Sequence, residues 1–208
     1  MRIELCGPLG VGKTTLAEKI ARYYGWQHVT EPVETHPFLS DFYDAPSEYG
    51  FEKNLFFLLD YLHQIKRLGN SGCVFDHSAV VHRAYASRHA VGSYERPVFY
   101  SLDRVIEAAG APDLLVNLVC PPEEIMRRIM QRGRTFESKV DIRYVEALSA
   151  AVQKEVQAVS HYIPVIDIDA GAYNFESSEE DTAEVIRQIK SRLSVPDVMS
   201  HVRGKIPA

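Results

Sequence analysis

The stretch Gly7-Pro8-Leu9-Gly10-Val11-Gly12-Lys13-Thr14 lies near the start of this 208-residue chain and fits the pattern G-x-x-x-x-G-K-[ST]. An apolar run at residues 3–6 precedes it, and Leu16 and Ile20 follow it at helical spacing. Glycines let such a loop curl so that backbone N–H groups point at phosphate oxygens, and the next helix adds its positive dipole end. The stretch therefore predicts a strand, a phosphate-binding loop and a helix, and it indicates binding of a nucleoside triphosphate.

The rest of the chain alternates short apolar runs with longer segments of helical period, which is typical of βαβ units around a parallel sheet. We expect five strands, at residues 3–6, 27–30, 73–75, 114–119 and 165–168. Further helices are expected at residues 55–68, 97–109, 121–132, from Asp141 onward, and 180–193. No repeat or linker divides the sequence, so we expect a single α/β domain over residues 1–208, with a loosely held tail from 195.

The composition excludes several classes of protein. Lys and Arg total 23 against 28 Asp and Glu, and the resulting charge of −5 argues against a dedicated binder of nucleic acid or membrane surfaces. No apolar run approaches the roughly 20 residues that span a bilayer, and the first residues lack the layout of a signal peptide. Three cysteines (Cys6, Cys73 and Cys120) form no disulfide framework. We therefore expect a cytoplasmic protein with reduced thiols.

Two acids follow predicted strands. Asp76 comes directly after the third strand and Glu31 after the second, where Pro32 keeps a helix from starting. Because the carboxyl ends of parallel strands face one crevice, both acids should converge with the phosphate loop. Asp76 would then hold a metal ion through water, and Glu31 would accept a proton during phosphoryl transfer. The alternatives are a helix cap for Asp76 and an exposed loop position for Glu31.

Residues 125–134 contain four arginines and no acid. Arg128 and Arg132 share one helix face, and Gly133 allows Arg134 to lie on a loop. Planar guanidinium groups suit the charge on a transferring phosphoryl group. The alternative is a solvated basic helix end that complements its own dipole.

In combination, the phosphate loop, Glu31-Pro32-Val33, Asp76-x-Ser78 and the arginine cluster resemble the deoxynucleoside kinase family over about residues 3–174. The guanine-reading strings of GTPases are absent. The resemblance implies a P-loop kinase with a five-stranded parallel sheet flanked by helices and an arginine-rich lid at about residues 132–140. It also implies ATP with Mg²⁺, a small-molecule nucleoside as acceptor, and a homodimer.

The resemblance assigns roles to individual residues. Catalysis falls to Glu31 as general base, Lys13, Arg128 and Arg132. Contacts with ATP fall to Gly7, Gly10, Val11, Gly12, Lys13, Thr14, Thr15, Arg132, Arg134, Asp169 and Ala170, and metal binding to Thr14 and Asp76. Contacts with the nucleoside fall to Glu31, Tyr43, Asn54, Asp76, His77, His82 and Glu137.

The sequence departs from the family pattern at three of these positions. His77 stands where the family has arginine, Asn54 where it has the glutamine that reads the base, and His82 where it usually has an aspartate that also reads the base. A shorter amide and an imidazole present different donors and acceptors. We therefore expect an altered base preference or a modified nucleoside; alternatively, both histidines are ordinary residues at a helix start.

Three functions remain open. The first is ATP-dependent phosphorylation of the 5′-hydroxyl of a nucleoside. The second is a nucleoside monophosphate kinase resembling thymidylate kinase, although the arginine that such enzymes use for the acceptor phosphate is His77 here. The third is a kinase-like subunit that binds or supports a partner without catalysis.

Overall fold

The computed structural model describes residues 1–69, 71–88 and 94–194, so the tail expected at 195–208 lies outside the described residues. Five strands form one sheet in the order β2-β3-β1-β4-β5, with every neighbouring pair parallel. The strands are β1 (Arg2–Cys6), β2 (Gln27–Val29), β3 (Cys73–Phe75), β4 (Leu114–Val119) and β5 (Val165–Asp169). Each strand end lies within one residue of its predicted position, which confirms the predicted α/β fold with a five-stranded parallel sheet.

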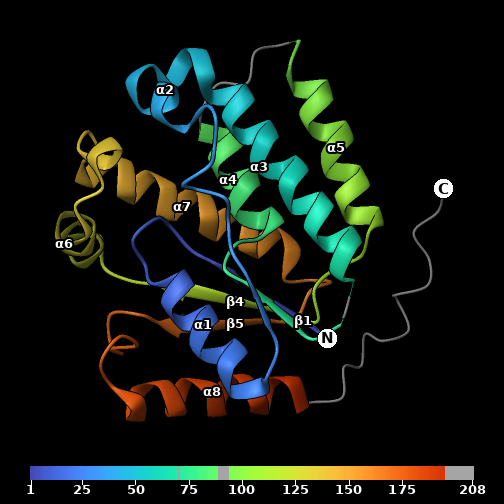
Figure 1. Ribbon diagram of the computed structural model, residues 1–208, viewed down its shortest axis with the longest axis vertical. Coiled ribbons are helices and arrows are strands. Elements are labelled where there is room, and N and C mark those ends of the chain that lie inside the picture. The colour runs from blue at the N-terminus through green and yellow to red at the C-terminus, as the bar shows by residue number, and fades with distance from the viewer. Residues whose placement is uncertain (70, 89–93, 195–208) are drawn as a thin grey trace.

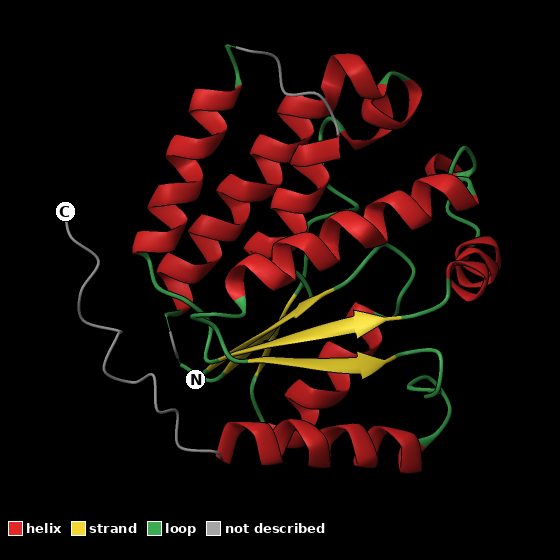
Figure 2. Cartoon of the chain, turned by 180° about the vertical axis from the view of Figure 1, so that it is seen from behind, coloured by secondary structure: helices red, strands yellow, loops and turns green. Residues whose placement is uncertain are grey.

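Helices cover both faces of this sheet (Figure 1). One face carries α1 (Lys13–Tyr24) and α8 (Glu179–Ser194). The other carries α3 (Pro46–Leu68), α4 (Ala79–Arg88), α5 (Arg96–Ala108) and α7 (Ile142–Val159). The remaining described helices are α2 (Leu39–Asp44), α6 (Pro122–Arg132) and the short 3₁₀ helix η1 (Thr135–Glu137). The strands point toward the edge where α6 lies (Figure 2), so their carboxyl ends and α6 lie at the same side of the molecule.

The central strands are buried on both faces, as their near-continuous apolar sequences require. Helix α7 buries the face of Val145, Leu148, Val152, Val156 and Val159 against the sheet. It begins after Asp141, as predicted, and the Asp141 carboxylate caps it by accepting a hydrogen bond from the Tyr144 N–H at 2.7 Å. These contacts fix the layers that position the strand ends.

The helical segments differ from the predictions in two respects. Helix α3 begins at Pro46 rather than at residue 55. The prediction missed its first turns because Gly50, Lys53 and Asn54 lie on the buried face of the helix but are not large apolar residues. Helices α2 and α4 were not predicted. Helix α2 has only six residues, and the buried face of α4 includes a histidine, His82, so neither shows a clear apolar period.

Candidate active site

The loop between β1 and α1 has the backbone geometry of a phosphate cradle. A Cβ atom on Gly7 would lie 2.7 Å from the Leu118 carbonyl oxygen, and Gly12 caps α1 at a φ of 106°, which side chains disfavour. The Lys13 ammonium group donates hydrogen bonds to the carbonyl oxygens of Gly7 (2.9 Å) and Pro8 (3.0 Å). The ammonium group therefore lies against the loop that would surround the phosphates.

Strand order brings the two predicted acids to this loop. Since β2, β3 and β1 are neighbours, their carboxyl ends meet, and the Glu31 N–H donates a hydrogen bond to Oδ1 of Asp76 at 3.0 Å. Burial lowers the pKa of Lys13, and the carboxylates of Glu31 and Asp76 oppose that shift. The predicted convergence of Lys13, Glu31 and Asp76 is confirmed.

Asp76 is the centre of a polar network. Burial alone would raise its pKa, but the hydrogen bond with His77 and the polar groups of His28 (Nε2 3.8 Å from Oδ2) and Thr14 hold the pKa of this carboxyl well below its usual range. His77 Nδ1 lies 3.1 Å from Oδ1 of Asp76, and the His77 side chain is buried. At the start of α4, Ser78 accepts the hydrogen bond from the Val81 N–H at 3.4 Å, so Ser78, rather than Asp76, caps this helix.

The arginines of α6 and the following loop make different contacts. Arg128 donates to the carbonyl oxygens of Val11 (3.0 Å) and Ala170 (2.8 Å), which ties the phosphate loop to the turn after β5. In that turn, Oδ1 of Asp169 accepts the Gly171 N–H at 2.9 Å. Arg128 thus lies at the phosphate loop and holds its backbone.

Arg132 and Arg134 meet a buried acid of the lid, Glu137. Arg132 donates two hydrogen bonds to the Glu137 carboxylate, at 2.6 and 2.7 Å, and Arg134 lies 3.8 Å from it. Tyr43 faces the same segment, with its ring centroid 5.4 Å from that of Phe136. The segment expected to form the lid and Tyr43, both named from the family resemblance, therefore lie in contact.

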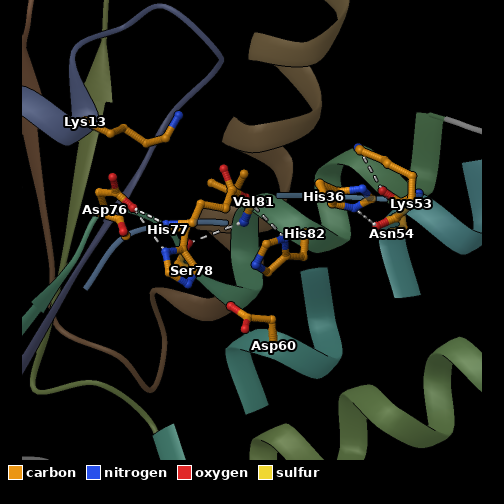
Figure 3. Close-up of polar contacts among 12 residues, drawn as sticks. Lys13, His36, Lys53, Asn54, Asp60, Asp76, His77, Ser78, Val81 and His82 are labelled. Carbon is orange, nitrogen blue, oxygen red and sulfur yellow. Dashed lines mark hydrogen bonds and ion pairs between the residues drawn. The ribbon is translucent and has the colours of Figure 1, made fainter. Parts of the chain in front are cut away.

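At the other end of the site lie His82, Asn54 and a residue that sequence reasoning missed, Lys53 (Figure 3). His82 stacks on Phe57, with ring centroids 5.9 Å apart and planes at 17°, and its Nδ1 lies 3.9 Å from Oε1 of Glu31. The Lys53 ammonium group donates a hydrogen bond to Oδ1 of Asn54 at 3.0 Å. The signal that could have found Lys53 is its position four residues before Phe57, on the buried face of α3.

Comparisons with known proteins agree with this architecture. The family model of deoxynucleoside kinases matches residues 3–194. The deoxyguanosine kinase of Lactobacillus acidophilus is 30% identical over 92% of this chain and 90% of its own length, and that of Bacillus subtilis is 26% identical over 90% and 95%. A structure of deoxyadenosine kinase from M. mycoides with bound dCTP has a TM-score of 0.77 at 19% identity, covering 92% of this chain and all of that one, which supports the fold. The chain belongs to the deoxynucleoside kinase family of enzymes.

Proposed function

We propose that this enzyme transfers the γ-phosphoryl group of ATP to the 5′-hydroxyl of a deoxynucleoside. The observation that carries the proposal is the convergence of the Glu31 carboxylate, the Lys13 ammonium group and Asp76 at the carboxyl ends of three adjacent strands. A phosphate loop needs a cation for the phosphates, and a hydroxyl acceptor needs a nearby base. This arrangement supplies both.

In this proposal Glu31 accepts the proton of the acceptor hydroxyl. Burial raises the pKa of Glu31, which strengthens it as a base, while His77, Lys13 and Lys53 oppose the shift and favour its ionised form. Lys13 and the loop from Gly7 to Thr15 hold the phosphates. Arg132 and Arg134 neutralise charge on the transferring group, and Arg128 keeps the loop in place.

The residues present fit a magnesium ion. The Thr14 side chain lowers the pKa of Asp76, so a hydroxyl and a carboxylate that interact beside the phosphate loop would supply two oxygen ligands. Among the described residues no group of three or more His, Cys, Asp or Glu side chains could hold a metal ion. Mg²⁺ suits such a site because it keeps several waters and takes few protein ligands. When bound, Mg²⁺ would neutralise phosphate charge.

The remaining predicted residues are proposed to contact the nucleoside: Tyr43 and Glu137 the sugar, His77 the region of the 5′-hydroxyl, and Asn54 and His82 the base. All five lie in the part of the chain that the structure describes, and four of them are buried.

Within that part, no helix is both long and apolar enough to cross a bilayer. We expect the enzyme to act on a free small molecule in the cytoplasm.

One assay tests this proposal against its alternatives. Purified enzyme is supplied with ATP and Mg²⁺ and either a panel of deoxynucleosides or the matching monophosphates, and ADP formation is coupled to NADH oxidation. The proposal expects turnover with nucleosides. Turnover with monophosphates alone would favour the monophosphate kinase, and no nucleoside-dependent ADP formation would favour a non-catalytic subunit.

We also propose that the enzyme is a homodimer. Helices α3 and α5, which pack against each other, expose the apolar residues Leu59 (50%), Val98 (49%) and Val105 (46%). Exposed apolar side chains on neighbouring helices suit a helix-to-helix contact between two copies. Sedimentation velocity should give a dimer for the native chain and a shift toward monomer for Val105→Glu. A native monomer at micromolar concentration would contradict the proposal.

A further inference from the structure

Lys53 is a cation enclosed by aromatic rings. Its side chain is 3% exposed, and its ammonium nitrogen lies 3.9 Å from the ring centroid of Tyr85, 4.7 Å from that of Phe42 and 5.7 Å from that of Phe57. The rings come from α4, α2 and α3. In the described part of the chain, Oδ1 of Asn54 is the hydrogen-bond acceptor that the structure gives this ammonium group (Figure 3).

The contact with Lys53 fixes the orientation of the Asn54 amide. An ammonium group can only donate, so the atom of Asn54 that faces it must be the carbonyl oxygen. The amide nitrogen, Nδ2, then points away from Lys53, and it is buried without a hydrogen-bond partner among the described residues. Asn54 thus offers its surroundings an unused donor group, and one lone pair of its oxygen is occupied by Lys53.

Lys53 and Asn54 together form a cluster of donors. The ammonium group has three N–H donors, of which one is bonded within the described ranges, and the Asn54 NH₂ group adds two more donors. Burial strips the ammonium group of its hydration, and the cation–π contacts with three rings offset only part of that cost. Unpaired buried donors are rare in proteins, and here they lie at the position that would read the base.

Nucleobases differ in what they present to such a cluster. A free amide reads adenine by accepting from the amino group at position 6 while donating to N7. Lys53 already occupies one lone pair of the Asn54 oxygen and fills the space beside it, so an amino group of adenine would meet one remaining lone pair and a neighbouring cation. A 6-oxopurine such as guanine or hypoxanthine instead presents two neighbouring acceptors, O6 and N7, which two neighbouring donors match.

We propose that the Lys53–Asn54 donor cluster selects 6-oxopurine deoxynucleosides over 6-aminopurine deoxynucleosides. The inference rests on the proposed function, because it takes the base to lie against Asn54. It assigns the discrimination to Lys53, which fixes the orientation of the amide and adds its own N–H donors beside it.

Deoxyinosine and deoxyadenosine form the sharpest pair for a test, since they share the sugar and the purine frame and differ in the 6-oxo and 6-amino groups. We expect kcat/KM to favour deoxyinosine by about tenfold to a hundredfold. Deoxyguanosine should behave like deoxyinosine, and 7-deazadeoxyguanosine, which lacks the N7 acceptor, should lose about tenfold. Equal or greater use of deoxyadenosine, or a preference for deoxycytidine over deoxyinosine, would overturn the inference.

The variant Lys53→Met frees the Asn54 oxygen and places an apolar side chain among the rings. Its ratio of kcat/KM for deoxyinosine over deoxyadenosine should fall by about tenfold, whereas Lys66→Met, at an exposed lysine of the same helix, should keep the native ratio. An unchanged ratio in a folded Lys53→Met enzyme contradicts the role of Lys53.

Calorimetric titration of the native enzyme with both nucleosides, without ATP, separates this inference from the proposed function. Tighter binding of deoxyinosine without any turnover would sink the proposed function and keep the selectivity. Turnover without a preference for deoxyinosine in binding or in kcat/KM would keep the proposed function and contradict the selectivity. If neither nucleoside binds, both proposals are wrong.

Discussion

The two ends of the site balance their buried charges in different ways. At the proposed phosphate end (Lys13, Asp76 and Arg128), Asp76 accepts hydrogen bonds from the Glu31 N–H and His77, Lys13 donates to two loop carbonyls, and Arg128 donates to two more. At the base end, Lys53 meets one amide oxygen and three rings, while Nδ2 of Asn54 and Nε2 of His82 are buried without partners among the described residues.

The two ends therefore differ in how far they depend on a bound ligand to pair their buried polar groups. A triphosphate always presents the same charged oxygens, so backbone and charge pairs can hold the phosphate end ready for it. Bases differ by single donors and acceptors, and a site discriminates among them when the wrong base leaves buried polar groups unpaired. We therefore expect substitutions at the phosphate end to cost turnover and stability, and substitutions at the base end to change selectivity.

The largest effect should come from Glu31→Gln. The amide cannot accept the hydroxyl proton, so kcat should fall by about 10² to 10⁴-fold. Binding of ATP, measured by calorimetry, should stay near the native value because Lys13 and the loop remain intact. Glu48→Gln, at an exposed glutamate of α3, serves as the control and should keep native turnover. A Glu31→Gln enzyme with native kcat would remove Glu31 from the mechanism.

Asp76→Asn should cost both turnover and stability. It removes the charge that accepts hydrogen bonds from the Glu31 N–H and His77 and that interacts with His28 and Thr14, so the free energy of unfolding at pH 7 should fall by about 2–3 kcal/mol. Because the pKa of Asp76 is depressed in the folded state, its contribution is complete above the unfolded pKa of about 4 and is lost as the pH falls below it. In urea unfolding, the variant should lose the same unfolding free energy relative to the native chain at pH 7 and pH 5, and less at pH 3. A deficit that is the same at pH 3 and pH 7 would show that the Asp76 charge is not what stabilises the network.

The phosphate end was largely predictable from the sequence. A glycine motif between an apolar strand and a helix has one common geometry, and acids directly after parallel strands must lie at one edge. The sequence alone therefore predicts that Glu31 and Asp76 lie close together. The use of Arg128 could not be foreseen, because its partners are the backbone oxygens of Val11 and Ala170, which carry no sequence signal.

The base end was less predictable for a physical reason. Burial of Lys53 requires rings from three helices, and two of these, α2 and α4, lack a clear apolar period. Asn54 and His82 were identified only through family resemblance. The donor character of Asn54 depends on the side-chain contact with Lys53, which the order of residues along the chain does not specify.

Lys53→Met should stabilise the fold, in contrast to Asp76→Asn. An apolar side chain of similar length avoids burying the ammonium group, and replacing buried charge by apolar groups gains about 1–4 kcal/mol. Burial lowers the pKa of Lys53 to about 7. Below pH 7 the buried charge therefore reduces the unfolding free energy of the native chain by its full amount. This loss shrinks as the pH rises toward the unfolded lysine pKa of about 10.4. The charged and titratable groups around it are Glu31, His36 and His82.

Urea unfolding of both proteins at pH 6 and pH 9 tests this expectation. The advantage of Lys53→Met should be larger at pH 6, while Lys66→Met should show no advantage at either pH. An equal advantage at both values would mean that Lys53 is already neutral in the folded protein at pH 6.

The smallest effect should come from His82→Phe, which probes whether the two ends are separate. Burial lowers the pKa of His82 well below its usual value, so the ring is neutral, and a phenyl group preserves its stacking on Phe57. Stability should change by less than about 1.5 kcal/mol, as for other swaps that conserve shape. If His82 serves only the base, KM for the nucleoside should rise while KM for ATP and kcat change little. His82 Nδ1 nevertheless lies 3.9 Å from Glu31, so a loss of kcat comparable to that of Glu31→Gln would show that the imidazole acts on the catalytic carboxylate and that base recognition and proton transfer are one unit.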